Sequence, residues 1–187
     1  MSVVTSHGEA AVAGYSAAQR LDSLFLLPAH ALGATVNSMA GQNIGVGKWG
    51  RVKQIATYGV VYNTVIMFLF AGIIVLFAEF GISLFIQEQA AVQFGAKYLM
   101  IIAFFYPFLG INFVLNGIVR ASGAMYQVLI LNLLSFWALR YPLAYLFSEI
   151  IGEDGIAYGI GVSFMLSSVI AFLYYRLGKW REKRIFS

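Results

Sequence analysis

A glycine-rich stretch before a lysine is the first feature of this sequence whose residue types could do chemistry. Residues 38–53 read SMAGQNIGVGKWGRVK, with Gly47 directly before Lys48. A phosphate-binding loop of this kind needs glycine, four residues and then Gly-Lys-Ser/Thr, because backbone N–H groups hold the phosphates and the hydroxyl holds Mg²⁺. Here Trp49 follows the lysine, and Gln42 stands where the first glycine belongs. The stretch is therefore not expected to bind phosphate.

Polar residues inside long apolar segments are the next candidates. Between residues 10 and 40, steps of three and four residues define one helical face of small and polar side chains, which includes Arg20, Ser23, His30 and Asn37. Asp22 lies off this face. Polar groups are costly inside a membrane, so they usually face protein or a water-filled cavity. This face is expected either to line an aqueous cavity or to pack closely on another helix, and both interpretations stay open.

Amides and a second arginine occur in the later apolar segments. The candidate cavity-lining residues there are Asn63, Asn112, Asn116 and Arg140. A buried amide needs a hydrogen-bond partner whatever the function of the protein. For each asparagine, a hydrogen bond between helices therefore competes with contact to a ligand.

Signatures of enzymatic catalysis are not found in the sequence. It contains no cysteine, no HExxH metal motif and no Gly-x-Ser-x-Gly nucleophile motif. No pair of acids lies inside the apolar segments, and one histidine there does not make a metal site. We expect a protein that is not an enzyme, with no metal or other cofactor and no nucleic-acid partner.

The composition places these residues in membrane-spanning helices. Of the 187 residues, 60% are hydrophobic and 11% are charged, whereas a soluble domain has about 25% charged residues. A spanning helix needs about 20 mostly apolar residues, and five segments qualify: 10–40, 55–77, 98–119, 125–147 and 155–175. The sequence predicts one all-α integral membrane domain, residues 1–187, with five transmembrane helices in a lipid bilayer. Pro28, Pro107 and Pro142 are expected to interrupt three of them.

Charged residues separate to opposite ends of these predicted helices. Nine of the twelve Lys and Arg residues follow the first, third and fifth segments, and most of the acids lie at the other joints. Because basic residues concentrate on the cytoplasmic side, the pattern predicts a multi-pass protein of the plasma (inner) membrane. Its N-terminus would lie outside and its C-terminus in the cytoplasm.

Several segments, taken in order, resemble one transporter family. Residues 11–52, AVAGYSAAQRLDSLFLLPAHALGATVNSMAGQNIGVGKWGRV, resemble the second helix of the C-terminal half of a multidrug and toxic compound extrusion (MATE) transporter. The tenth helix of that family is similar to GAKYLMIIAFFYPFLGINFVLNGIVRASG, the eleventh to LRYPLAYLF, and the twelfth to GIAYGIGVSFMLSSVIAFLYYRLGKW. The resemblance covers nearly the whole chain.

The resemblance implies twelve helices in two six-helix lobes related by a pseudo-two-fold axis. This chain would supply helices eight to twelve, which is most of the C-terminal lobe. An N-terminal lobe and the seventh helix, from the same or another chain, would complete the transporter. The implied activity is secondary active efflux of cationic amphipathic compounds in exchange for Na⁺ or H⁺, by alternating access. The nine candidate residues would line its cavity.

The coupling ion is not determined by the resemblance. One branch of the family carries an acidic cation ligand in the tenth helix, and the corresponding position falls near Leu109. No acid lies between residues 98 and 120, so that site does not carry over. Asp22 matches a family position for which we expect a structural role.

Two other functions compete with drug efflux. A flippase for lipid-linked oligosaccharides shares this architecture, but it would hold pyrophosphate with several cationic residues, and only Arg20 and Arg140 are available. A non-transporting membrane protein that pairs with a partner, or a remnant of a transporter, is the other alternative.

Overall fold

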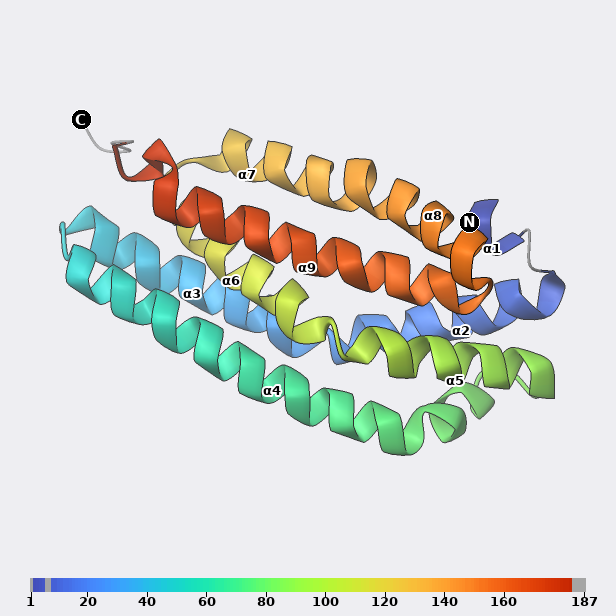
Figure 1. Cartoon of the computed structure of the whole chain (residues 1–187). Coiled ribbons are helices and arrows are strands. Elements are labelled where there is room, and N and C mark those ends of the chain that lie inside the picture. The colour runs from blue at the N-terminus through green and yellow to red at the C-terminus, as the bar shows by residue number, and fades with distance from the viewer. Residues whose placement is uncertain (1, 6–7, 183–187) are drawn as a thin grey trace.

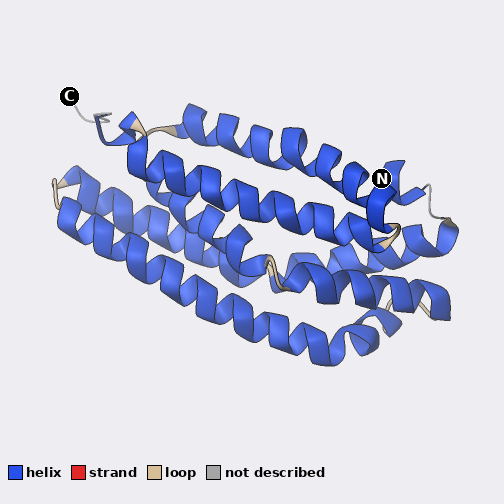
Figure 2. Ribbon diagram, viewed as in Figure 1, coloured by secondary structure: helices blue, strands red, loops and turns tan. Residues whose placement is uncertain are grey.

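In the computed structural model, residues 2–5 and 8–182 are described, and all their regular elements are helices (Figure 2). In chain order they are α1 (Ser2–Thr5), α2 (Glu9–Phe25), α3 (Leu27–Gly45), α4 (Trp49–Ser83), α5 (Gln89–Ala103), α6 (Tyr106–Ala121), α7 (Met125–Leu133), the π-helix η1 (Leu134–Leu139), α8 (Arg140–Ile151), α9 (Asp154–Leu177) and the 3₁₀-helix η2 (Lys179–Glu182).

The long helices run side by side, and the α5–α6 pair lies at the centre of the bundle (Figure 1). Helix α6 packs on α3, α4 and α9, and α5 packs on α2, α4 and α9. The α7–η1–α8 segment lies at one side of the bundle and packs mainly on α9. It is the least buried of the long apolar segments, because only 17% of its most apolar stretch is covered.

Three of these segments change direction or winding near the middle of the bundle. Helix α2 passes to α3 at Leu26, α5 passes to α6 with a bend of 53°, and the π-helix η1 separates α7 from α8. Each change precedes a proline, as predicted for Pro28, Pro107 and Pro142. Proline has no N–H to donate to the preceding turn, so the α-helical hydrogen-bond pattern cannot continue through it unchanged.

The apolar helices agree with most of the predicted spans. Helix α4, the α7–η1–α8 segment and α9 are each long and apolar enough to cross a membrane, and the bent pair α5–α6 would be a fourth span. Helix α4 extends beyond the predicted 55–77 at both ends. The first predicted span became α2, which has 17 residues, and α3. Since this polar pair is not among those apolar segments, a count of five spans stays a prediction.

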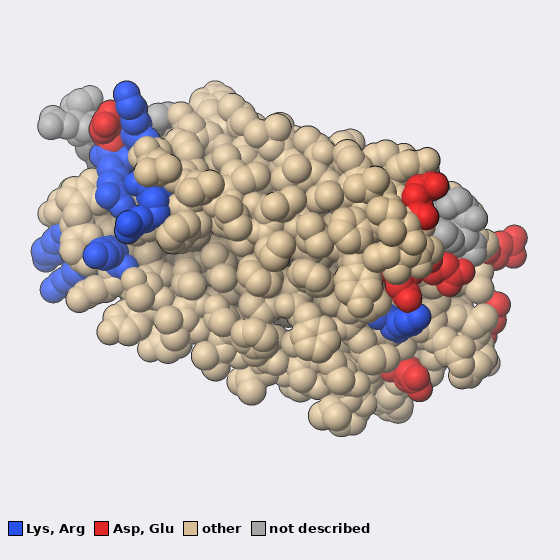
Figure 3. Space-filling view, in the orientation of Figure 1, with Lys and Arg blue, Asp and Glu red and all other residues tan. Residues whose placement is uncertain are grey.

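Charge is separated along the bundle as the sequence predicts. Figure 3 shows lysine and arginine gathered at one end, which we call the basic end, and most acidic residues at the other. The basic end carries the turn between α3 and α4 and the end of α9. Lys97 is the basic residue at the acidic end, where its Nζ lies 2.6 Å from a carboxylate oxygen of Asp154. Lys183 and Arg184 of the predicted basic tail lie outside the described residues.

The glycine-rich stretch forms the turn at the basic end. Helix α3 ends at Gly45 and α4 begins at Trp49. Gly47 has a φ of +68°, in the left-handed region that favours glycine. The N–H of Lys48 donates to the carbonyl oxygen of Asn43 at 2.8 Å, which closes the turn. This geometry is that of a turn between two antiparallel helices. It agrees with the sequence, which lacks the phosphate-binding motif at this place.

Small residues allow α8 and α9 to approach closely. Gly155 and Gly159 lie four residues apart in α9, a spacing of small residues that favours close helix packing. A methyl group built on Gly159 would meet the backbone of α8 at Leu143 and Ala144. The buried apolar side chains form two clusters, one centred on Met67, Leu99 and Ile102 and the other nearer the basic end around Val114 and Ile118.

Candidate functional site

A hydrogen bond between α2 and α6 defines the most polar part of the interior. Asp22, in the last turn of α2, is 7% exposed, and it is the only acidic residue among the described ones that is buried. The hydroxyl of Tyr106, the first residue of α6, donates to its Oδ1. Tyr106 is completely buried. The carboxylate is therefore held directly beside two of the helix interruptions.

Further polar groups surround this pair, and we call the set Gln19, Asp22, Tyr98, Tyr106 and Arg140 the mid-bundle cluster. Gln19 Nε2 donates to the hydroxyl of Tyr98 at 3.3 Å. Arg140 lies close enough to interact electrostatically with both Asp22 and Tyr98. The cluster brings together residues from α2, α5, α6 and α8. Its members could hold or pass a proton, or offer oxygen ligands to a small cation.

Arg140 connects the cluster to a cavity of about 450 Å³ between α2, η1–α8 and α9. Its guanidinium carbon lies 5.6 Å from the ring centroid of Phe164, a favourable cation–π distance. Tyr15, Phe136 and Trp137 also line the cavity. Its volume is in the range of small-molecule sites, and aromatic walls with one cation offer stacking surfaces and few polar anchors.

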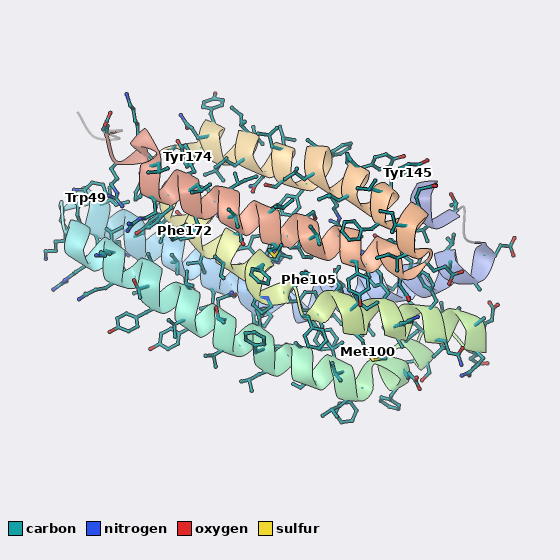
Figure 4. All side chains as sticks on the ribbon, viewed as in Figure 1. Trp49, Met100, Phe105, Tyr145, Phe172 and Tyr174 are labelled. Carbon is teal, nitrogen blue, oxygen red and sulfur yellow. The ribbon has the colours of Figure 1, made fainter. Side chains whose placement is uncertain are left out.

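Asn63 joins α4 to the interruption between α5 and α6. Its Nδ2 donates to the carbonyl oxygen of Pro107 at 3.1 Å, and the side chain is fully buried. Its Oδ1 is buried without a hydrogen-bond partner among the described residues. The same short segment therefore carries Tyr106, bonded to α2, and Pro107, bonded to α4. Phe105 lies beside them in the middle of the bundle (Figure 4).

Asn112, Asn116 and Asn132 form a ladder of hydrogen bonds between α6, α7 and α9. Asn112 Nδ2 donates to the carbonyl oxygen of Ser167 at 3.1 Å. Asn116 Nδ2 donates to Asn112 Oδ1 at 2.8 Å and to Asn132 Oδ1 at 3.1 Å. These bonds match the interhelical interpretation of the amides. Asn116 Oδ1 is buried and unpaired among the described residues, so it keeps an acceptor free.

Most of the polar face predicted on residues 10–40 is exposed in the described part of the chain, although His30 contacts α6 through Phe113. Arg20, Ser23 and His30 are exposed and Asn37 is half-buried. Ser23 Oγ donates to the carbonyl oxygen of Gln19 at 2.8 Å, and the His30 ring lies 4.4 Å from that of Phe113. The opposite face of α3 is the packed one. The structure therefore brings Asp22, Arg140 and Asn63 to the helix interruptions and Asn112 and Asn116 together in the ladder. Arg20, Ser23 and His30 lie at the surface, and Asn37 is half-buried.

Tyr98 and Tyr106 of the cluster were not among the candidates from the sequence. A tyrosine in an apolar segment is usually interpreted as a membrane-interface or packing residue. Its spacing in the sequence does not show which way its hydroxyl points. The available signal was the position of Tyr106 directly before Pro107, because a helix interruption frees backbone groups and draws polar partners. Among the described residues, no group of three His, Cys, Asp or Glu residues could hold a metal ion.

Broken apolar helices around a buried polar cluster define an integral membrane protein of the discontinuous-helix type. A family model described as MatE matches residues 1–146, most of the chain. The chain belongs to this family, the multidrug and toxic compound extrusion transporters, which confirms the resemblance seen in the sequence.

Two named relatives agree with this family membership. The chain is 57% identical over all 187 residues to the "Probable multidrug resistance protein YpnP" of Bacillus subtilis, covering 42% of that protein. It is 27% identical to the "Probable multidrug resistance protein YoeA" of the same species, with 99% of this chain and 40% of that protein covered. The chain therefore spans about two-fifths of the length of these relatives.

The fold is also that of a solved transporter. The crystal structure of the Vibrio cholerae MATE transporter VcmN in the bent form superimposes with a TM-score of 0.91. The match covers 97% of this chain and 41% of that chain at 22% sequence identity. The all-α membrane fold expected from the sequence is thereby confirmed.

Proposed function

We propose that this chain forms most of the C-terminal lobe of a multidrug efflux antiporter. The complete transporter would export cationic amphipathic compounds in exchange for Na⁺ or H⁺, by alternating access. An N-terminal lobe, from the same or another chain, would close the cavity from the other side. The substrate class is supported by the 57% identity to a relative named as a probable multidrug resistance protein.

The observation that carries this proposal is the placement of Asp22. It is a buried acid, bonded to Tyr106 and located beside the junction of α2 with α3 and the bend between α5 and α6. Ionisable residues inside a membrane are costly and usually mark ion or proton pathways. Transporters typically bind substrate and coupling ion near the bilayer midplane, where helices are discontinuous. Asp22, for which the sequence alone suggests a structural role, would on this basis bind the coupling ion, and the aromatic cavity beside Arg140 would contact the substrate.

The proposed location is the inner membrane, with the basic end in the cytoplasm. The gathering of lysine and arginine at one end of the bundle supports this orientation. The N-terminus would then lie outside and the C-terminus inside. The bilayer and the N-terminal lobe would be the partners of this chain.

Dye efflux from cells tests this function. Cells that express the complete transporter containing this chain should expel a cationic dye when an inward gradient of Na⁺ or H⁺ is imposed. Asp22→Asn keeps the shape and the acceptor oxygen for Tyr106 but removes the charge, so ion-driven efflux should fall at least about 10-fold, the size of a lost charged contact. Glu9→Gln makes the same chemical change at an exposed site in α2 and should leave efflux unchanged.

The possible results distinguish an error in the efflux function from an error in the role of Asp22. An absence of dye efflux and of drug resistance across a broad panel would contradict the efflux function as a whole. Normal efflux by the Asp22→Asn variant would contradict only the role of Asp22 in coupling. The amount of folded protein in the membrane, measured by fluorescence-detected gel filtration, must be equal in all three proteins.

A further inference from the structure

A groove runs along the bundle between α4 and α9, with α6 as its floor. It encloses about 530 Å³, and its walls are mainly apolar: Val60 and Val61 from α4, Phe108, Ile111 and Leu115 from α6, and Phe172 from α9. Helices α4 and α9 each pack on α6 but hardly touch each other. Val61 and Phe172 are 48% and 51% exposed, so the groove is open along its length.

Three basic side chains lie at the basic end of this groove. Lys53 of α4, Arg176 of α9 and Arg181 of η2 line it, and all three are exposed. The ion pair recorded among the described residues joins Lys97 and Asp154 at the opposite end of the bundle. No described carboxylate therefore lies within 4 Å of the three cations, and their charge is available to an anion.

The basic end is built from a rigid aromatic platform. The guanidinium of Arg181 lies 5.1 Å from the Trp180 ring centroid and 5.6 Å from that of Tyr175, and the two rings stack at 5.4 Å. Trp180 is 1% exposed, and its Nε1–H donates to the carbonyl oxygen of Tyr175 at 2.9 Å. Cation–π contacts of this kind restrict the position of the arginine.

The groove continues into a second recess at the same end. This recess encloses about 490 Å³ and shares Lys53, Tyr175 and Arg181 with the groove. Trp49 and Trp180 form its walls, with ring centroids 6.2 Å apart. Trp49 of α4 and Phe172 of α9 lie toward this end of the bundle (Figure 4). A head group at the cations would therefore have space on one side and a long apolar channel on the other.

We propose that this groove is a binding site for an anionic phospholipid of the leaflet at the basic end. The phosphate would lie between Lys53, Arg176 and Arg181, and one acyl chain would lie along Val61, Ile111 and Phe172. Each cation near an anionic membrane surface adds to the attraction. The chain would fill the space between α4 and α9, and so would tie together two helices that otherwise meet only through α6.

Charge and shape together select this occupant. A free anion would leave the apolar groove uncovered, and a neutral lipid would leave three cations unpaired. Only a molecule with a negative group at one end and a long apolar chain satisfies both parts of the site. Tryptophan and tyrosine at the mouth are also the side chains that favour the interface of a membrane.

Native mass spectrometry and thermal unfolding of the purified chain in detergent test the proposal. Phosphatidylglycerol should remain bound, and it should raise the unfolding midpoint more than phosphatidylcholine does, because a ligand of the folded state stabilises it. The triple variant Lys53→Gln/Arg176→Gln/Arg181→Gln should bind phosphatidylglycerol on the order of 100-fold more weakly.

A matched control separates the groove from general surface charge. Lys48→Gln/Arg51→Gln/Lys179→Gln removes the same charge from the same end, at exposed residues that do not line the groove. It should bind the lipid nearly as well as the unchanged chain. Equal losses in the two triple variants would overturn the proposal in favour of diffuse attraction to the surface.

A steric variant tests the apolar part separately. Val61→Trp places a bulky ring in the groove at an exposed position and leaves the cations intact, so the bound lipid should be lost while the gel-filtration profile stays normal. Undiminished binding would overturn the acyl-chain site. The same stabilisation by inorganic phosphate, or no preference for phosphatidylglycerol, would also overturn the proposal. Absence of bound phosphatidylglycerol in the complete transporter would overturn the groove as a lipid site of the transporter.

Discussion

At the scale of single residues, the central contact is the one between Asp22 and Tyr106. A buried carboxylate loses its hydration and needs donors from the protein. Tyr106 supplies one hydrogen bond, and Arg140 adds a favourable electrostatic interaction. Arg20, two residues from Asp22, is exposed, and it lies on a different face of α2, as the helical spacing predicts. Arg20 and Asp22 therefore have separate surroundings although they are neighbours in α2.

The free energy of unfolding should reveal the strength of this contact. Tyr106→Phe removes the donor, and we expect a loss of about 1–3 kcal/mol, because a buried charged acceptor is left without its partner. The same substitution in an Asp22→Leu background should cost much less, which is the result a double-mutant cycle reports for coupled residues. Denaturant unfolding in detergent measures both.

An exposed tyrosine provides the control for this cycle. Tyr126 is 78% exposed, so Tyr126→Phe should change the unfolding free energy by less than about 0.5 kcal/mol. If Tyr106→Phe cost the same with and without Asp22, the hydrogen bond would not be the reason for its effect, and packing of the tyrosine ring would be.

At the scale of the elements, the interruptions determine where the polar residues gather. The sequence predicts an interruption at each of the three prolines, since proline lacks the N–H that a helix requires. The structure adds the type of each interruption: a junction at Leu26, a bend of 53° before α6, and a π-helix before α8. A π-helix inside a longer helix often accompanies a functional site. Arg140 follows η1 directly and faces the aromatic cavity.

Close packing of α8 on α9 is a second feature at this scale. Gly159→Ala would place a methyl group against the backbone of Leu143 and Ala144. Because backbone cannot move aside as a side chain can, we expect a loss of about 1–3 kcal/mol of stability. Thermal unfolding in detergent, followed by gel filtration, should show a clearly lowered midpoint for this variant.

Gly72→Ala is the matched control in α4. No atom lies within 4 Å of a methyl group built there, and alanine favours a helix over glycine by up to about 1 kcal/mol. Its midpoint should stay the same or rise. A midpoint for Gly159→Ala as high as that of the control would show that α8 and α9 are not held at this distance.

At the scale of the whole molecule, the separation of charge gives the bundle a direction. Most lysine and arginine residues lie at one end and most acids at the other (Figure 3). The same arrangement underlies the proposed orientation and the proposed lipid site, because both depend on cations at one membrane surface. The exposed face with Arg20, Ser23 and His30 is a second feature of the molecule as a whole. It is the surface on which a second lobe of the transporter could close.

Single cysteines test the orientation, and the chain is suited to this because it has no cysteine of its own. A cysteine in place of Gly45, beside the turn at the basic end, should react with an impermeant maleimide only after cells are opened. A cysteine in place of Glu88, before α5 at the acidic end, should react in intact cells. The reverse pattern would contradict the orientation with the basic end in the cytoplasm.

Local features of the sequence are enough to predict an all-helical fold, the interruptions at the three prolines and the two charged ends. These follow from local properties: the length of apolar runs, the missing N–H of proline, and which joints between helices carry the basic residues. The resemblance carried by residues 11–52 and the later segments also identified the family. The first predicted span is the most polar of the five, and α2 and α3, which it became, are not among the helices apolar enough to cross a membrane.

The tertiary structure alone decided which polar residues meet. Asp22 and Tyr106 are 84 positions apart, and nothing in the spacing of either helix shows that α2 and α6 place them face to face. The groove between α4 and α9 likewise exists only because both helices pack on α6 and leave a space between them. Local chemistry decides how a segment folds, whereas contacts between distant segments depend on how all the helices fit around one another, and that is where the site arises.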